Sequence, residues 1–303
     1  MTPRTETSIS AVGLDRTVLS IGNFDGVHVG HRALLSRMRS LADELQLPAV
    51  AISFFPTSRM VFNDSGFLSS AQEKALLLGE FSPEAVVLIP FSREYAQTDP
   101  QVFLSELRQL GPAAVTVGVD FRFGRERQGT LNDISLVTGK LEVFGLVESP
   151  DGSVISSSRI RELLAAGDVA AANALLGAPY LALGKVIKGD QRGRTIGFPT
   201  ANLAVPEGKV LPPGVFAVSA TVQGRSHSGM ANVGPRPSFP DGTPALEVNL
   251  FDFDGDLYGQ ELAVRFISRI RGQQKFASLD ELKARLAEDE RVAREQLREG
   301  KSA

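Results

Sequence analysis

The first half of the chain alternates short apolar runs with stretches in which apolar residues recur every three or four positions. Residues with this helical spacing extend from His31 to Leu45. A Ser70–Glu73 capping-box pair and an Asp99-Pro100 pair mark the starts of two further helices. Five apolar runs have the length and composition of buried strands, residues 17–21, 49–55, 86–89, 115–119 and 142–147. This alternation predicts an α/β domain with a mainly parallel sheet covered by helices.

From residue 180 onward, strand-like runs follow one another without helices between them. These runs cover residues 181–187, 215–222, 230–233, 246–253 and 262–270. Short strands separated only by turns predict a small antiparallel barrel or sandwich. A Ser278–Glu281 pair then predicts one terminal helix. Glycine and proline around residues 177–179 predict the boundary, which gives domains of residues 1–178 and 179–303.

The composition excludes several classes of chemistry. The 303 residues contain no cysteine, which excludes disulfides, thiolate metal sites and cysteine nucleophiles, and they contain only three histidines. The net charge of −3 argues against nucleic-acid binding. No stretch reaches the ~18 apolar residues of a membrane helix. Residues 1–10 contain no apolar signal segment, so we expect a cytoplasmic protein without a membrane partner. The composition makes no prediction of oligomeric state.

The loop after the first predicted strand contains two of the three histidines. Residues 22–31 read Gly-Asn-Phe-Asp-Gly-Val-His-Val-Gly-His, so His28 and His31 share a face at the start of a helix. Glycines let the backbone approach a ligand closely, and free amides at a helix N-terminus attract phosphate. Two imidazoles add hydrogen-bond donors for developing negative charge. The alternative is a turn with two incidental surface histidines.

Several segments in order along the chain resemble one enzyme family. Residues 22–31, 117–124 and 155–161 are similar to the nucleotidylyltransferase motifs of bifunctional prokaryotic FAD synthetases. Residues 193–203, which include Gly-Phe-Pro-Thr-Ala-Asn-Leu, resemble the riboflavin-kinase signature of that family, and residues 246–248 and 256–259 resemble its later elements. The resemblance implies a Rossmann-like nucleotidylyltransferase domain followed by a riboflavin-kinase barrel. It also implies ATP-dependent phosphorylation of riboflavin to FMN, and then adenylylation of FMN to FAD with release of pyrophosphate.

In the first half, the resemblance implies catalytic roles for His28, His31 and Arg161. The nucleotide-binding residues that it implies are Gly22, Asn23, Phe24, Asp25, Gly30, Ser157 and Ser158. From the residues alone, serines and an arginine at a helix start suit a triphosphate, and the alternative is an ordinary helix cap. The implied flavin-binding residues are Phe54, Asp120, Phe121 and Phe123. Aromatic rings beside a polar group suit an isoalloxazine ring, and the alternative is that these rings belong to the core.

In the second half, Thr200 and Asn202 lie two apart and would point to the same side of an extended chain. Their oxygen atoms suit a hard Mg²⁺ ion carrying nucleotide phosphates. The resemblance assigns these two residues to the metal, assigns Glu247 as the base that accepts the ribityl hydroxyl proton, and assigns ATP binding to Lys185, Gly193 and Arg194. The alternatives are a solvated basic loop and a structural salt bridge of Glu247.

One segment departs from the family pattern Thr-Phe-x-Pro-His-Pro. Residues 53–58 read Ser-Phe-Phe-Pro-Thr-Ser, so the histidine and the second proline are absent. The departure leaves open a riboflavin kinase whose first domain is a non-catalytic flavin or nucleotide sensor. A nucleotidylyltransferase acting on another phosphate ester, with the barrel as a binding module, is a second alternative. The presence of Thr200, Asn202 and Glu247 argues against the latter.

Overall fold

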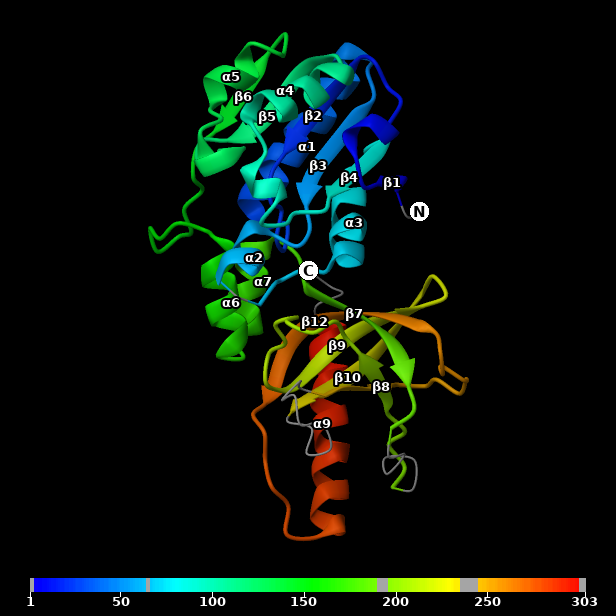
Figure 1. Ribbon diagram of the computed structural model, residues 1–303. Coiled ribbons are helices and arrows are strands. Elements are labelled where there is room, and N and C mark those ends of the chain that lie inside the picture. The colour runs from blue at the N-terminus through cyan, green and yellow to red at the C-terminus, as the bar shows by residue number, and fades with distance from the viewer. Residues whose placement is uncertain (1–2, 64–65, 190–195, 235–244, 300–303) are drawn as a thin grey trace. The chain divides into compact units, whose positions relative to one another are not determined.

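The computed structural model of the protein describes residues 3–63, 66–189, 196–234 and 245–299 (Figure 1). It consists of two compact units, Met1–Ser157 and Ser158–Ala303, and each is described by itself. Among the described residues, no helix combines the length and the apolar character needed to cross a bilayer.

The first unit contains one parallel sheet, as the alternation of strands and helices predicts. Its strand order is β1-β4-β3-β2-β5-β6, and every neighbouring pair is parallel. The bounds are β1 Thr5–Glu6, β2 Thr17–Ile21, β3 Ala49–Phe54, β4 Ala85–Ile89, β5 Pro112–Gly118 and β6 Leu141–Phe144. The two-residue strand β1 is too short to leave a periodic signal and was not predicted. Apart from β1, the chain adds β3 and β4 on one side of β2 and then β5 and β6 on the other, so the direction of winding reverses between β2 and β5.

Helices cover both faces of this sheet. They are α1 Val29–Leu45, α2 Ser58–Asn63, α3 Ala71–Gly79, α4 Pro100–Gln109 and α5 Leu131–Ser135, with short 3₁₀ turns at Ile9–Ala11, Tyr95–Gln97 and Arg125–Arg127. Helix α1 buries the face that contains Leu35 and Met38. Helix α4 packs Phe103 and Leu107 into the core cluster that contains Leu19 of β2. The sheet is therefore covered on both sides, as predicted.

The structure contains the capping hydrogen bonds expected at the predicted helix starts. The Ser70 hydroxyl accepts from the Glu73 amide at 3.2 Å, and the Glu73 carboxylate accepts from the Ser70 amide at 2.7 Å. Asp99 caps α4 by accepting from the Gln101 amide at 2.8 Å. These bonds satisfy amides that have no partner within the helix, which is why the sequence signals fix these starts.

The second unit is built around a closed antiparallel barrel, which decides between the barrel and the sandwich. The strand order is β10-β11-β8-β7-β12-β9. The bounds are β7 Tyr180–Ile187, β8 Ala201–Ala204, β9 Gly214–Val222, β10 Arg225–Gly234, β11 Ala245–Leu250 and β12 Glu261–Arg271. Helices α6 Ser157–Ala165 and α7 Val169–Leu176 precede the barrel, and α7 packs on β12 and β7. The expected boundary at residues 178/179 thus falls after these helices, whereas the contacts divide the chain at residues 157/158.

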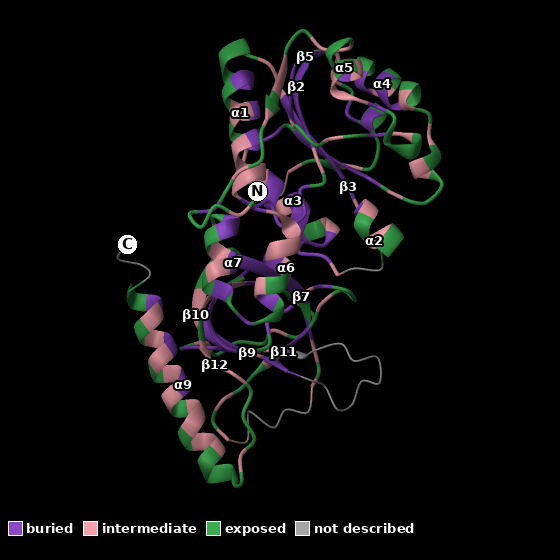
Figure 2. Ribbon diagram, turned by 90° about the vertical axis from the view of Figure 1, so that its left-hand side faces the viewer, coloured by how far each residue is buried: buried purple, intermediate pink, exposed green. Residues whose placement is uncertain are grey.

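Helix α9 Leu279–Glu299 is the predicted terminal helix and lies against β9, β10 and β12. Buried and partly buried positions lie along it between exposed ones (Figure 2). Ala293 and Leu297 pack against Met230 of β10. The fully buried Asp289 carboxylate binds the Arg271 guanidinium of β12, with 2.8 Å from Nη2 to Oδ2. Charge and apolar packing together attach the helix to the barrel.

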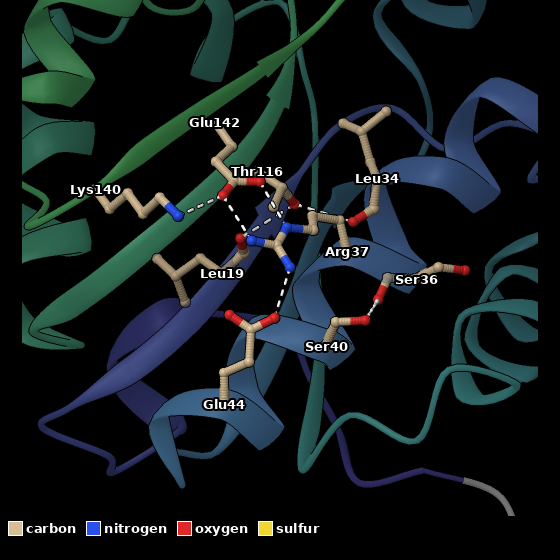
Figure 3. A network of polar contacts seen from close by, with 9 residues as sticks. All are labelled: Leu19, Leu34, Ser36, Arg37, Ser40, Glu44, Thr116, Lys140 and Glu142. Atoms are coloured by element: carbon tan, nitrogen blue, oxygen red, sulfur yellow. Dashed lines mark hydrogen bonds and ion pairs between the residues drawn. The ribbon is translucent and has the colours of Figure 1, made fainter.

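A network of polar contacts joins α1 to β6 in the first unit. Figure 3 shows the Arg37 guanidinium between two carboxylates. Its Nε and Nη2 atoms donate to Glu142 at 2.8 and 2.9 Å, and Nη1 donates to Glu44 at 2.7 Å. Lys140 adds a second cation, 2.7 Å from the Glu142 carboxylate. The hydrogen bonds from Arg37, followed by those from Lys140, lower the pKa of Glu142 from 4.5 to about 2.

We predict that Glu142→Gln lowers the stability of the protein near pH 7 and that the difference from wild type closes in acid. A carboxyl whose pKa is lower in the folded than in the unfolded chain stabilises the fold above its unfolded pKa, and this contribution is lost as the pH falls from 4.5 toward 2. Urea-unfolding midpoints measured from pH 7 to pH 2.5 test this expectation. Glu44→Gln, at the more exposed partner of Arg37, should have a smaller effect. Equal destabilisation by Glu142→Gln at pH 7 and pH 2.5 would contradict the assignment.

Candidate active sites

The first site is built on the loop between β2 and α1. Phe24, Gly26 and Val27 have φ angles of 44°, 83° and 46°, which lie in the left-handed region. The side chains of Phe24 and Val27 are fully buried, and this burial offsets the strain of a conformation that such residues rarely adopt. A side chain at Gly22 would place its Cβ 2.8 Å from Cε1 of the Phe24 ring. Glycine is therefore required at this position by packing within the loop.

Asp25 anchors the loop to the segment that precedes α3. Its carboxylate Oδ1 accepts from the amides of Leu68 and Ser69 at 2.9 and 3.0 Å. The Ser69 hydroxyl accepts from the Gly26 amide at 3.0 Å. Ser157 donates to the Asp25 carbonyl at 2.9 Å. The hydrogen bonds of Asp25 and Ser157 therefore fix the conformation of the loop. Contacts of these two residues with ATP stay predictions.

His28 and His31 are brought together as their spacing predicts. Their ring centroids lie 3.6 Å apart and the rings are inclined by 19°, which is a stacked arrangement. The buried Phe24 ring meets His31 edge-on at 5.2 Å. The Nδ1 atoms of both histidines are buried and have no hydrogen-bond partner within the described part of the chain. Buried polar atoms in proteins nearly always have hydrogen-bond partners, so a bound ligand would be expected to supply partners for these two imidazole nitrogens.

Both histidines are neutral at pH 7. Burial lowers the pKa of His28 from 6.5 to about 4, although the charges of Asp25 and Asp120 oppose the shift. Burial also lowers the pKa of His31 well below 6.5, and the neighbouring His28 and Lys74 lower it further. Each ring is then one N–H donor and one acceptor rather than a cation.

The chain winds so that the loops after β2, β3 and β5 meet at one edge of the sheet. These strands are neighbours and all parallel, and the winding direction reverses between β2 and β5. Ligands of open α/β sheets bind beyond the carboxyl ends of the strands at such a reversal. The loop after β2 ends at His28, with His31 in the first turn of α1, the loop after β3 carries residues 55–57, and the loop after β5 carries Asp120.

The predicted flavin residues lie in two different environments. Phe54 and Phe123 are each 7% exposed and belong to the core cluster, where both rings contact Phe103. Phe121 is partly buried and stacks on Phe123 at 5.9 Å, and Asp120 is exposed. Phe54 and Phe123 are therefore packed as core residues, which is the alternative considered from the sequence. Phe121 and Asp120 are the members of this set that a ligand could reach, and flavin binding stays a prediction for the whole set.

The segment that departs from the family pattern forms the connection from β3 into α2. The Phe55-Pro56 peptide bond is cis. Thr57 is only 6% exposed, and its amide donates to Met60 Sδ at 3.4 Å. The residue that stands at the missing histidine is therefore packed into the protein at the same edge of the sheet.

The remaining residues of the first set lie on helix α6. Ser157 begins this helix, and Arg161 Nη2 donates to the Ser158 hydroxyl at 3.3 Å. Ser158 and Arg161 belong to the second compact unit. Their predicted position on the other side of the triphosphate therefore stays a prediction. Gly30 lies in the first turn of α1, and a Cβ there would come 3.3 Å from the His28 ring.

The second site is a row of polar side chains across three strands of the barrel. Glu247 of β11 lies directly opposite Asn202 of β8 and Asn232 of β10. Residues paired in this way project to the same face of a sheet. Asn232 Nδ2 donates to the partly buried Glu247 carboxylate at 3.4 Å, and Gln273 Nε2 donates to Asn232 Oδ1 at 2.9 Å. Gln273 thereby orients the Asn232 amide with its N–H group toward Glu247.

Asn202 belongs to this row, and Thr200 lies two residues before it in the chain. Asn202 is 9% exposed, and a Cβ at Gly189 would collide with its amide group, so glycine is required there. Thr200 is exposed and immediately precedes β8. Asn249 Nδ2 donates to the carbonyl of Pro199 at 2.7 Å and so fixes the peptide next to Thr200.

The predicted ATP residues of the second half are only partly described. Lys185 is an exposed residue of β7 opposite Glu261. Gly193 and Arg194 lie outside the described residues. A nucleotide contact of these three residues stays a prediction.

The chain is similar to known proteins over almost its whole length. Residues 12–159 match the family described as FAD synthetase, and residues 176–297 match the family described as riboflavin kinase. A Haemophilus influenzae protein named bifunctional riboflavin kinase/FMN adenylyltransferase is 36% identical over 93% of this chain and 94% of that protein. An Escherichia coli K12 protein with the same name is 39% identical over 95% of each chain. The chain belongs to the bifunctional riboflavin kinase/FMN adenylyltransferase family.

A solved structure of similar fold covers almost the whole chain. The crystal structure called Macrolide-efflux Protein from Streptococcus pneumoniae is 31% identical, covers 97% of this chain and 99% of that chain, and has a TM-score of 0.83. Within the family, residues 12–159 form the FMN adenylyltransferase part and residues 176–297 form the riboflavin kinase part. The histidine pair thus lies within the FAD synthetase match, and the Glu247 row lies within the riboflavin kinase match.

Four residues at these sites were not found from the sequence. They are Lys74, Asn232, Asn249 and Gln273, each of which reaches the site through a contact with a distant part of the chain. Lys74 lies on a helix where a lysine would ordinarily be exposed, and the three amides stand in or beside strands with no motif around them. No local signal in the sequence distinguishes these residues.

We predict that the first unit loses stability as the pH falls from 6.5 to 4, and that His28→Gln reduces this loss. Because the pKa of His28 is about 4 in the folded chain and near 6.5 when unfolded, the unfolded state binds more protons in this range. Urea-unfolding midpoints at pH 7.5 and pH 5 for wild type and variant provide the measurement. If the variant lost as much stability as wild type on acidification, the burial of a neutral His28 would be refuted.

Proposed function

We propose that FMN adenylylation takes place at the loops after β2, β3 and β5, and that riboflavin phosphorylation takes place at the polar row around Glu247. The observation that carries the first assignment is the stacked pair His28–His31 at the reversal point of the sheet, whose buried Nδ1 atoms have no hydrogen-bond partner among the residues that the structure describes. A helix N-terminus and two neutral imidazoles there suit the phosphates of a nucleotide.

In the adenylylation step, an oxygen of the FMN phosphate attacks the α-phosphorus of ATP. A new P–O bond forms, and the bond to the β-phosphate oxygen breaks, so that pyrophosphate leaves with the electron pair. The attacking phosphate is already anionic, so the site needs donors and alignment rather than a strong base. We assign these functions to His28, His31 and Arg161, with Ser157, Ser158 and residues 22–25 on the nucleotide. Asp120 and Phe121 are the accessible residues for the flavin.

In the phosphorylation step, the ribityl 5′-hydroxyl oxygen bonds to the γ-phosphorus of ATP while Glu247 accepts the hydroxyl proton. The bond from the γ-phosphorus to the β-phosphate oxygen breaks, and ADP leaves. The Asn232 amide holds the carboxylate in one orientation, and Gln273 holds the amide. An Mg²⁺ ion would neutralise charge on the nucleotide phosphates. The donor set fits this ion, because Asn202, which lies opposite Glu247, and Thr200, two residues before it, carry an amide oxygen and a hydroxyl oxygen, and Mg²⁺ takes oxygen ligands.

We further propose a division of the two activities at residues 178/179, supported by the start of the riboflavin kinase match at residue 176. The proposed partners are small molecules rather than nucleic acid, because the net charge is −3. A cytoplasmic location is consistent with a chain that contains no cysteine.

Two substitutions should separate the activities. His28→Ala should lower FAD formation by about 100-fold or more through loss of a donor to developing charge, and it should leave FMN formation unchanged. Glu247→Ala should lower FMN formation by about 100-fold or more through loss of the base, and it should leave FAD formation from added FMN unchanged. Chromatographic separation of the flavins after incubation with ATP, Mg²⁺ and riboflavin or FMN provides the measurement.

The unmodified chain is the reference for this experiment. Riboflavin should give FMN first and FAD later, whereas accumulation of FMN alone would favour a non-catalytic sensor in the first unit. Equal loss of both reactions in either folded variant would refute the two-site assignment.

A further inference from the structure

Lys74 is a charged side chain in an unusual place. It lies on α3 and is fully buried, although lysine is almost never fully buried unless its charge is paired. Its ammonium donates to the carbonyl of Asn23 at 2.7 Å and to the carbonyl of Phe54 at 2.7 Å. It also lies 5.8 Å from the centroid of the Phe55 ring. The cost of burying this charge is thus offset by backbone carbonyls and an aromatic ring.

The two carbonyls belong to the two loops that must be aligned for adenylyl transfer. Asn23 lies in the loop after β2, which leads to His28 at the start of α1, and its carbonyl also accepts from the Ser53 hydroxyl at 3.0 Å. Phe54 is the last residue of β3, where the segment beginning at Phe55 leaves the sheet. The Lys74 ammonium therefore connects the loop after β2 to the end of the neighbouring strand β3.

We propose that Lys74 is a positioning residue for FMN adenylylation, whose ammonium fixes the loop after β2 relative to the end of β3. This inference rests on the proposed location of adenylylation at these loops. Lys74 acts through Asn23 and Phe54 and not by contact with the reacting atoms. Since a small misplacement of a reacting group lowers an enzymatic rate strongly, loss of this tie should reduce alignment of ATP with FMN.

The surroundings of Lys74 also predict how the tie responds to pH. Burial lowers the pKa of Lys74 from 10.5 to about 8, and the charge of Asp25 opposes this shift. Within the described part of the chain, the titratable groups that interact with it from other elements are Asp25 of the loop and the neutral His31 of α1. The adjacent Glu73 carboxylate of α3 accepts from the Ser70 amide. The ammonium should thus be lost as the pH rises through 8, which weakens both bonds to the carbonyls.

The test compares Lys74→Met and Lys74→Gln with wild type in the full-length chain. Met keeps the length of the side chain without a donor, and Gln keeps a donor on a shorter stem. We expect Lys74→Met to lower kcat/KM for FAD formation from FMN and ATP by about 10- to 100-fold, with Lys74→Gln in between. In wild type, kcat/KM for this reaction should fall as the pH rises from 7 to 9, and this fall should be absent in Lys74→Met. Riboflavin phosphorylation should remain unchanged in all three proteins.

A matched variant separates positioning from stability. Leu78 is also fully buried on α3, and Leu78→Ala should lower the unfolding midpoint without lowering FAD formation per folded molecule. The proposal is overturned if Lys74→Met keeps FAD formation within twofold per folded molecule, or if it loses activity only in proportion to unfolding as Leu78→Ala does. If Lys74→Met does not fold, the decision passes to Lys74→Gln and the wild-type pH profile, and wild-type activity that is flat to pH 9 also overturns it. Retention of FAD formation by His28→Ala would instead refute the proposed site itself.

Discussion

The pairing of β2 with β3 on one side and β5 on the other is the constraint on which the proposed adenylylation site depends. Parallel strands all end at the same edge, so this pairing delivers three loops to one place although their residues are up to about 100 positions apart in the chain. Pairing alone does not fix how the loops lie beyond the last hydrogen bond of the sheet. In this protein, polar side chains supply that second level of order.

These side chains act on backbone groups rather than on one another. Asp25 holds amides of residues 68–69, while Ser53 and Lys74 hold the carbonyl of Asn23. Each bond satisfies a backbone group at the end of a strand or in a loop, where regular secondary structure offers no partner. These bonds prevent the loop from relaxing, so Phe24 and Val27 can keep their strained left-handed backbone conformation.

The barrel positions its polar groups by a different rule. Glu247, Asn202 and Asn232 are neighbours because strand register places them opposite one another, and their separation along the chain is irrelevant. A shift of one residue in the pairing of β11 would move Glu247 to the other face. The apolar neighbours Leu246 and Val248 are 0% and 1% exposed and resist such a shift, so the packing of the barrel also fixes the face that presents the carboxylate.

The sequence predicted those parts of the fold and sites that depend on local signals. Helix caps, strand runs and the spacing of His28 and His31 each involve residues within a few positions, and the structure confirms them. Lys74 and Gln273 could not be predicted, because their bonds connect residues 20 to 51 positions apart and depend on tertiary packing. Phe54 and Phe123 illustrate the opposite difficulty, since a ring next to a site and a ring in the core have the same sequence signal.

Burial gives the histidines and Lys74 opposite electrostatic states in one small region. Removal from water disfavours the charged form of every base. The imidazoles are therefore neutral at pH 7. Lys74 keeps most of its charge at this pH, because its pKa starts higher and its ammonium donates to two carbonyls. The remaining positive charge then lowers the pKa of His31 further. An arriving polyanion would reverse this balance, because negative phosphates raise the pKa of nearby imidazoles. Under the proposed function, the imidazole donors would therefore strengthen as negative charge develops on the phosphates, while the Lys74 ammonium holds the loop through the carbonyl of Asn23.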